Sequence, residues 1–163
     1  MVSQGCQVST SCSGILDNIL TFMGVRRKSR EAALQFLFQE DFKLEEGHQV
    51  DNFLERFESF CTLYQVNRQA RPYAQQLLEG ILKDRSEIDS CIERAASNWR
   101  LARIAATDRN ILRLAVYEMM SDAEVPDQVA INEAVEIAKR FAGDDSPAFI
   151  NGVLDAVKTL LRS

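Results

Sequence analysis

The stretch IAATDRNILRLAVYEMMSDAEVPDQVAINEAVEIAKRFAGDDSPAFINGVLDAVKTLL, residues 104–161, decides the fold because it holds three clear helix signals. Thr107 is a candidate N-cap for the first helix, which carries apolar residues at helical spacing. Val125-Pro126 breaks the chain before the second helix. Ser146-Pro147 opens the third, with Ser as the N-cap and Pro at the first helical position. Helices joined by such short loops must pack together, since none can bury its apolar stripe alone.

Four further helices are predicted in the preceding part of the chain, over 29–44, 50–64, a segment opening at Arg71-Pro72, and 86–96. The first is expected to point four residues inward: Ala33, Leu34, Leu37 and Phe38. The second has the most regular apolar stripe, which is typical of a core: Val50, Phe53, Leu54, Phe57, Cys61 and Tyr64. Because 46% of the residues are hydrophobic and strand-like alternation is missing, the sequence predicts an all-α globular protein.

A basic run precedes the first of these helices. It places four cations within six residues of a chain whose net charge is −5: Arg26, Arg27, Lys28 and Arg30. Concentrated cations on an acidic protein indicate a local anion site and disfavour general polyanion binding. The helix dipole also opposes cations at a helix N-terminus, which favours a ligand-binding role. Nucleic acid phosphate is the commonest polyanion, although, for the run alone, a solvated terminus is the more frequent explanation.

No catalytic or metal-binding motif is found. The P-loop, the dinucleotide-binding glycine motif, the hydrolase nucleophile motif and the zinc-protease motif are all missing from the sequence. The single histidine, His48, follows two acidic residues in a predicted loop. The four cysteines lack metal-ligand spacing, which favours reduced thiols in a cytoplasmic protein: Cys6, Cys12, Cys61 and Cys91. We therefore expect a binding protein with no cofactor, no metal and no small-molecule substrate.

Residues 1–24 differ in composition from the rest of the chain. Gly, Ser, Thr, Gln and Cys dominate up to Gly14, and residues 15–23 are modestly apolar. A secretory signal requires a basic segment and a longer apolar run, and a membrane span requires a much longer one. We expect a disordered leader, or an over-extended start with Met23 as the initiator. A short helix over 15–22 is the alternative.

Four strings in the chain resemble the bacterial NusB family of transcription antitermination factors. They are REAALQFLFQ (30–39), WRLARIAATDRNILRLAVYEM (99–119), VPDQVAINEAVEIAKRF (125–141) and DDSPAFINGVLD (144–155). Several separated motifs in the family's order are a specific signal. The resemblance covers about residues 25–158 and is least distinctive over 45–69.

The resemblance implies both a fold and a function. NusB-like proteins are compact bundles of about seven helices in two packed helical subdomains, here expected at 25–84 and 85–163. They bind boxA, a single-stranded RNA element near the start of ribosomal RNA transcripts, together with a small-subunit ribosomal protein called NusE. They thereby act with the antitermination complex of RNA polymerase, in the cytoplasm and away from membranes.

The resemblance also assigns site residues. The RNA-facing positions on and before the first helix correspond to Arg26, Arg27, Lys28, Arg30 and Phe38. The C-terminal RNA-facing positions correspond to Phe141, Asp145, Ser146 and Phe149, and the face toward NusE would include Asp108 and Glu118. Phe38 stands where tyrosine also occurs in the family, so stacking is retained without a hydroxyl. Apart from the resemblance, the other two phenylalanines are expected in the core; with it, at least one should be partly exposed.

Two other functions stay open. A NusB-like domain also occurs in some ribosomal RNA cytosine methyltransferases, so the chain would be an RNA-targeting partner of a separate catalytic chain. A protein–protein adaptor that contacts only the ribosomal protein is the second alternative. The basic run disfavours the adaptor. Asn132-Glu133, early in a predicted helix, is interpreted as a polar contact between helices.

Overall fold

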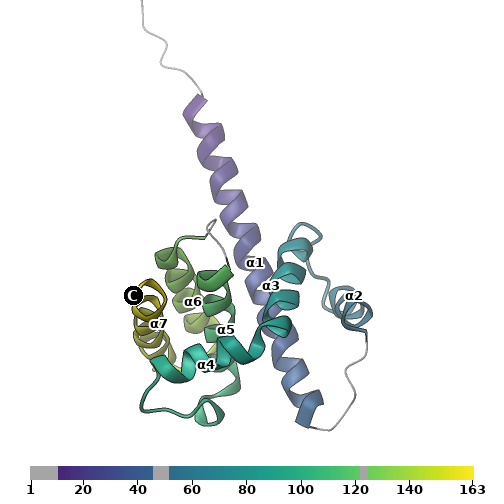
Figure 1. Ribbon diagram of the computed structural model, residues 1–163. Coiled ribbons are helices and arrows are strands. Elements are labelled where there is room, and N and C mark those ends of the chain that lie inside the picture. Colours follow the sequence, from purple (N-terminus) through teal and green to yellow (C-terminus); the bar gives the residue numbers. More distant parts are fainter. Residues whose placement is uncertain (1–10, 46–51, 122–124) are drawn as a thin grey trace, which may run out of the picture.

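The computed structural model describes residues 11–45, 52–121 and 125–163. Over these ranges the chain forms seven α-helices and a short 3-10 turn, with no strand (Figure 1). The elements in order are α1 (Ser11–Glu45), α2 (Phe53–Leu63), α3 (Arg71–Lys83), α4 (Arg85–Ala95), η1 (Leu101–Arg103), α5 (Ala106–Ser121), α6 (Asp127–Phe141) and α7 (Ser146–Arg162). The all-α prediction is therefore confirmed.

The central element is α5. It packs against α1, α3, α4, α6 and α7, and every residue from Asn110 to Val116 is buried. A helix that is buried on all sides belongs to the interior of a protein. In Figure 1, α5 lies between the α6–α7 pair and the α1–α3 pair. One continuous apolar core thus joins both ends of the chain, and the expected division at Asp84-Arg85 stays a prediction.

One aromatic side chain of α1 organises the contact with α2. Phe36 is buried, and its ring meets the rings of Phe57 and Phe60 edge to face at 5.7 and 5.4 Å. Phe38, which was predicted to point inward, is 37% exposed instead. Residues two apart on a helix point about 200° away from each other, so only one of the two can face α2. The predicted α2 stripe was wrong at Leu54 and Tyr64, which are both exposed, and its first member, Val50, lies outside the described residues.

The helix α1 begins at Ser11, well before the expected start at Ser29. No proline interrupts this segment, and adding a residue to an existing helix costs much less than nucleating a new one. The expected disordered leader is therefore helical from Ser11 onward, while residues 1–10 and His48 lie outside the described residues. The basic run lies inside α1, so the argument from the helix dipole was wrong.

Three further observations concern the expected chemistry. Cys61 and Cys91 are free and buried, and burial raises the pKa of both thiols, which makes them unreactive. Within the described ranges, no group of three or more His, Cys, Asp or Glu side chains could hold a metal ion. No helix in that part of the chain has the length and apolar character needed to cross a membrane.

Candidate nucleic-acid interface

The basic run divides into a buried part and an exposed part. Arg30 is 4% exposed, and its Nε donates to Oε1 of Glu118 at 2.9 Å. Its Nη1 also lies 3.5 Å from Oε2 of Glu133. A charge taken out of water needs such partners, because an unpaired buried charge costs several kcal/mol. Arg30 was predicted to bind RNA and Glu118 to bind a partner. We correct both assignments, because the two side chains are buried against each other.

Tyr73 completes this buried cluster. Its hydroxyl donates to Glu118, and its ring lies under the guanidinium of Arg26 at 4.4 Å from the ring centroid. Burial, together with the nearby Glu118 carboxylate, raises the pKa of Tyr73, so its hydroxyl remains protonated as a donor. A cation over an aromatic face is attracted by the ring, by about 0.5–1 kcal/mol at exposed sites. Tyr73 therefore fixes both the buried carboxylate and an outer arginine.

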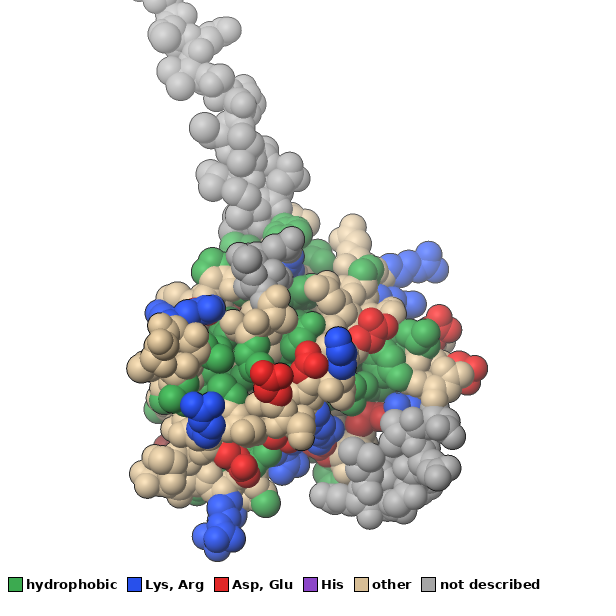
Figure 2. Space-filling view, in the orientation of Figure 1, with side chains coloured by type: hydrophobic (Ala, Val, Ile, Leu, Met, Phe, Trp, Pro, Cys, Tyr) green, Lys and Arg blue, Asp and Glu red, His purple; other side chains and the backbone are tan. Residues whose placement is uncertain are grey.

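Three cations of the run lie at or near the surface: Arg26, Arg27 and Lys28. Arg27 donates from Nε and Nη2 to Glu133 at 2.9 and 2.5 Å, yet 44% of its side chain stays exposed. The hydrogen bond to Glu133 raises the pKa of Arg27. Glu133 is thus a polar contact between α6 and α1, as predicted, whereas the adjacent Asn132 is exposed and accepts from Gln128 within α6. On the face shown in Figure 2, basic and acidic side chains are interspersed, with apolar and other groups between many of them, so no large patch of one charge appears there.

A hollow of about 450 Å³ lies between α1 and the end of α6, and we name it the α1–α6 hollow. Its lining is mostly apolar and aromatic: Leu34, Gln35, Phe38, Gln39, Tyr64, Thr107 and Phe141. Phe38 meets Phe42 edge to face at 5.0 Å, and the amide of Gln39 donates to the hydroxyl of Tyr64. Flat rings beside amide groups suit the faces and edges of unpaired nucleobases.

A second hollow of about 330 Å³ lies between the start of α5 and the start of α7, and we name it the α5–α7 hollow. Its lining brings together four predicted site residues: Asp108, Asp145, Ser146 and Phe149. The other lining residues were not predicted: Trp99, Arg103, Ile104 and Ala105. The rings of Phe149 and Trp99 meet edge to face at 5.8 Å. This hollow therefore offers an aromatic wall and exposed or half-buried carboxylates.

Ser146 makes a structural contact at the α5–α7 hollow, and its predicted contact with RNA stays a prediction. It is buried, and its hydroxyl donates to Oδ2 of Asp108 at 3.0 Å. The N-cap position of α7 is occupied by Asp145, with no side-chain capping bond. Thr107, the other predicted N-cap, lies inside the first turn of α5, which begins at Ala106. The Ser146 hydroxyl holds the start of α7 against the start of α5 and so shapes the hollow.

The cations and the two hollows follow one another along the molecule. Side chains connect α1 to α6 at Arg27–Glu133 and again at Glu31–Arg140, the latter at 2.8 Å. The α1–α6 hollow comes next, where both helices contribute a ring. The step from residue 133 to residue 141 of α6 is roughly 12 Å at the helical rise. Thr107 lines one hollow and its neighbour Asp108 lines the other, so the two hollows adjoin across the start of α5.

Of the three predicted aromatic site residues, Phe38 is exposed and the other two are less accessible. Phe141 and Phe149 both pack against the core and are both half-buried, so the expectation that at least one is partly exposed is confirmed. The sequence interpretation missed Trp99, Arg103 and Tyr64, which line the hollows. The available signal for Trp99 was that the single tryptophan of the chain falls between two predicted helices.

Comparison with known proteins gives consistent matches. A model of the NusB family matches residues 27–159, a range that contains every predicted site residue except Arg26. The transcription antitermination protein NusB of Desulfotalea psychrophila is 59% identical over 140 residues, which cover 86% of this chain and 99% of that protein. The solved NusB of T. maritima is 34% identical with a TM-score of 0.71, covering 82% of this chain and 90% of that one. A crystal structure of the antitermination factors NusB and NusE in complex with double-stranded RNA has a TM-score of 0.71 at 28% identity, covering 85% of this chain and 98% of that one.

Proposed function

Because this chain belongs to the NusB family, we propose that it is a transcription antitermination factor that binds unpaired boxA-type RNA together with a NusE-type ribosomal protein. One observation carries this proposal. The surface cations of α1 lead into two adjoining hollows with aromatic walls. The proposed role is binding without catalysis, in the cytoplasm, as part of the antitermination complex of RNA polymerase.

The chemistry of the two hollows supports RNA over other anions. Cations such as Lys28 neutralise phosphates, whereas rings such as Phe38 and Phe149 stack on bases, each stack contributing roughly 1–3 kcal/mol. Asp145 repels phosphate, but its carboxylate accepts hydrogen bonds from the exocyclic amino groups of bases. A ligand with negative phosphates on one side and amino groups on the other fits this arrangement.

Unpaired RNA suits the hollows better than a duplex does. A base within a duplex is stacked between its neighbours and cannot enter a recess, whereas unstacked bases can be splayed against aromatic rings. The related NusB–NusE crystal structure holds double-stranded RNA, so the preference for single strands is a specific part of the proposal. Arg26–Lys28 would contact phosphates in either form.

The proposed contact with the ribosomal protein is centred on Asp108. Unlike Glu118, its carboxylate reaches a surface hollow, and it is held by Ser146. Because Asp145 and Phe149 line the same hollow, RNA and the ribosomal protein would meet near the start of α5. This arrangement would make their binding cooperative.

A binding titration tests the proposed function. Labelled single-stranded boxA-like RNA, a scrambled strand and the boxA-like duplex would each be titrated with the full chain, with and without a NusE-type protein. We expect the single strand to bind most tightly and the ribosomal protein to strengthen that binding. Binding of the ribosomal protein without any affinity for RNA would contradict the proposal and favour the adaptor function.

A further inference from the structure

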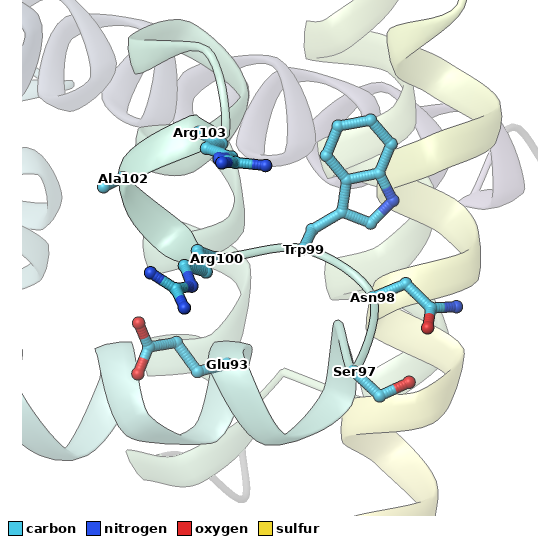
Figure 3. Close-up of a pocket in the computed structure, with 7 residues that line it drawn as sticks. All are labelled: Glu93, Ser97, Asn98, Trp99, Arg100, Ala102 and Arg103. Atoms are coloured by element: carbon cyan, nitrogen blue, oxygen red, sulfur yellow. The ribbon is translucent and has the colours of Figure 1, made fainter.

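Trp99 is a large aromatic side chain that the proposed function does not yet use. It lies in the loop between α4 and η1 and is 54% exposed. It borders the α5–α7 hollow on one side and a larger hollow of about 820 Å³ on another. The larger hollow is lined by Glu93, Ser97, Asn98, Trp99, Arg100, Ala102 and Arg103 (Figure 3). The ring of Trp99 and the half-buried ring of Phe149 have centroids 5.8 Å apart and together form an apolar surface with polar neighbours, which is the kind of patch that indicates a binding site.

Two arginines accompany this ring. Arg100 and Arg103 are both exposed, and Arg103 lines the larger hollow as well as the α5–α7 hollow. Figure 3 shows the Arg103 side chain extending toward the indole, from the short turn that follows Trp99. Glu93, on α4, is the carboxylate in the lining of the larger hollow. The two arginines therefore outnumber the single carboxylate in the larger hollow, whereas Asp108 and Asp145 line the α5–α7 hollow on the other side of the ring.

The loop that carries these side chains is held by its own backbone. The N–H of Trp99 donates to the carbonyl of Ala96 at 2.7 Å, and the N–H of Arg103 donates to the carbonyl of Arg100 at 2.8 Å. On its far side, the indole rests against Phe149 at 5.8 Å between ring centroids. Trp99 is thus positioned before a ligand arrives, which lowers the entropy cost of binding.

We propose that Trp99, Arg100 and Arg103 extend the RNA-binding face beyond Phe149, with the indole stacking on one further unpaired base and the arginines contacting the phosphates beside it. This inference rests on the proposed function, because the RNA strand must first occupy the α5–α7 hollow. A stacking ring beside cations is the usual arrangement for single-stranded nucleic acid. RNA is favoured over a protein ligand because the cations continue a face that already offers rings and cations.

The single tryptophan of the chain makes the test direct, because emission excited at the long-wavelength edge of the indole band, where the three tyrosines do not absorb, reports on Trp99 alone. Single-stranded boxA-like RNA would be titrated while Trp99 emission and the anisotropy of a label on the RNA are recorded together. We expect emission to be quenched in parallel with the anisotropy change. Trp99→Leu should weaken RNA binding about fivefold to a hundredfold, and Trp99→Phe should retain most of the affinity.

Matched variants and a melting curve complete the experiment. Arg103→Gln should weaken binding and make it less dependent on salt, whereas Arg94→Gln, an exposed arginine outside the hollows, should not. The anisotropy could show that RNA binds while Trp99 emission stays constant and Trp99→Leu binds RNA as tightly as the wild type. That result would overturn this inference and leave the proposed function standing. Emission that responds to the ribosomal protein and not to RNA would also overturn it. RNA that fails to bind at all would overturn both proposals.

Discussion

Arg30 and Glu118 form a buried ion pair that ties α1 to the central helix α5. Nη2 of Arg30 lies 2.8 Å from Oε1 of Glu118, and the two side chains are 5% and 2% exposed. Glu133 approaches the same guanidinium from α6, so three helices meet at this arginine. A residue that belongs by sequence to a cationic run therefore stabilises the fold, while Lys28, one half-turn earlier, faces solvent.

Replacing Arg30 tests this structural role. Arg30→Ala leaves the buried Glu118 carboxylate without its cationic partner and removes a longer contact to Glu133, which keeps Arg27. We expect it to lower the free energy of unfolding by about 3–5 kcal/mol. Urea denaturation of the variant and the wild type measures the difference. In the fraction that remains folded, the dependence of RNA affinity on salt should be unchanged. A stable variant with weaker RNA binding would instead place Arg30 at the RNA.

Lys28 provides the matched surface variant. Lys28→Ala should change the free energy of unfolding by no more than about 0.5 kcal/mol. The plot of log K against log salt for single-stranded RNA should become shallower by about 0.7, the value for one lost phosphate contact. Titrations at several salt concentrations measure the slope. An unchanged slope would remove Lys28 from the RNA interface.

Two phenylalanines of α1, Phe36 in the core and Phe38 at the surface, separate stability from binding. Phe36→Ala empties a buried site among the rings of α2 and should cost about 3–5 kcal/mol of stability. Phe38→Ala removes a partly exposed ring and should instead weaken RNA binding by about 1–3 kcal/mol. Thermal melting and RNA titration of both variants give the comparison. If Phe38→Ala lost as much stability as Phe36→Ala and bound RNA normally, the Phe38 ring would be assigned to packing.

Asp41 predicts how stability depends on pH. Burial alone would raise the pKa of its carboxyl, but hydrogen bonds from Asn110, Arg85 and Arg109 outweigh that effect and lower the pKa below its usual 3.8. The unfolded chain therefore takes up this proton first as the pH falls. The contribution of Asp41 to stability is complete well above pH 3.8 and is lost as the pH drops toward the lower pKa of the folded state.

The variant Asp41→Asn measures that contribution. It leaves Arg85 and Arg109 facing a neutral amide, and we expect it to cost about 3 kcal/mol at neutral pH. The difference from wild type should shrink when the denaturation is repeated in acid. Asp144→Asn, at an exposed carboxylate, is the control and should change neither the free energy of unfolding at neutral pH nor that in acid. A difference from wild type that is independent of pH would contradict this account of Asp41.

Much of the fold was predictable because local signals decide the ends of most helices. Proline at Arg71-Pro72, Val125-Pro126 and Ser146-Pro147 marks the starts of α3, α6 and α7 to within a residue or two. The apolar period also identifies most of the core. It does not distinguish Phe36 from Phe38, because both are phenylalanines close in sequence and only contact with α2 decides which one is buried.

The parts that were not predictable depend on partners far away in the sequence. Arg30 and Glu118 are separated by 88 residues, and nothing local to either residue shows that they meet. The basic run therefore appeared as four equivalent cations. The α5–α7 hollow likewise requires the start of α5, the loop before it and the start of α7 to come together, so the position of Trp99 between two predicted helices did not show which residues it would join.

The most direct test of the central claim is photochemical cross-linking of single-stranded boxA-like RNA to the full chain, with the linked residues identified by mass spectrometry. The claim is that unpaired RNA is held by the outer cations of α1 and by the rings of the two hollows. We predict cross-links at Phe38, Phe141 and Phe149, and their loss when the RNA is annealed into a duplex. Cross-links confined to α2 or to the end of α7, with none at these three rings, would contradict it.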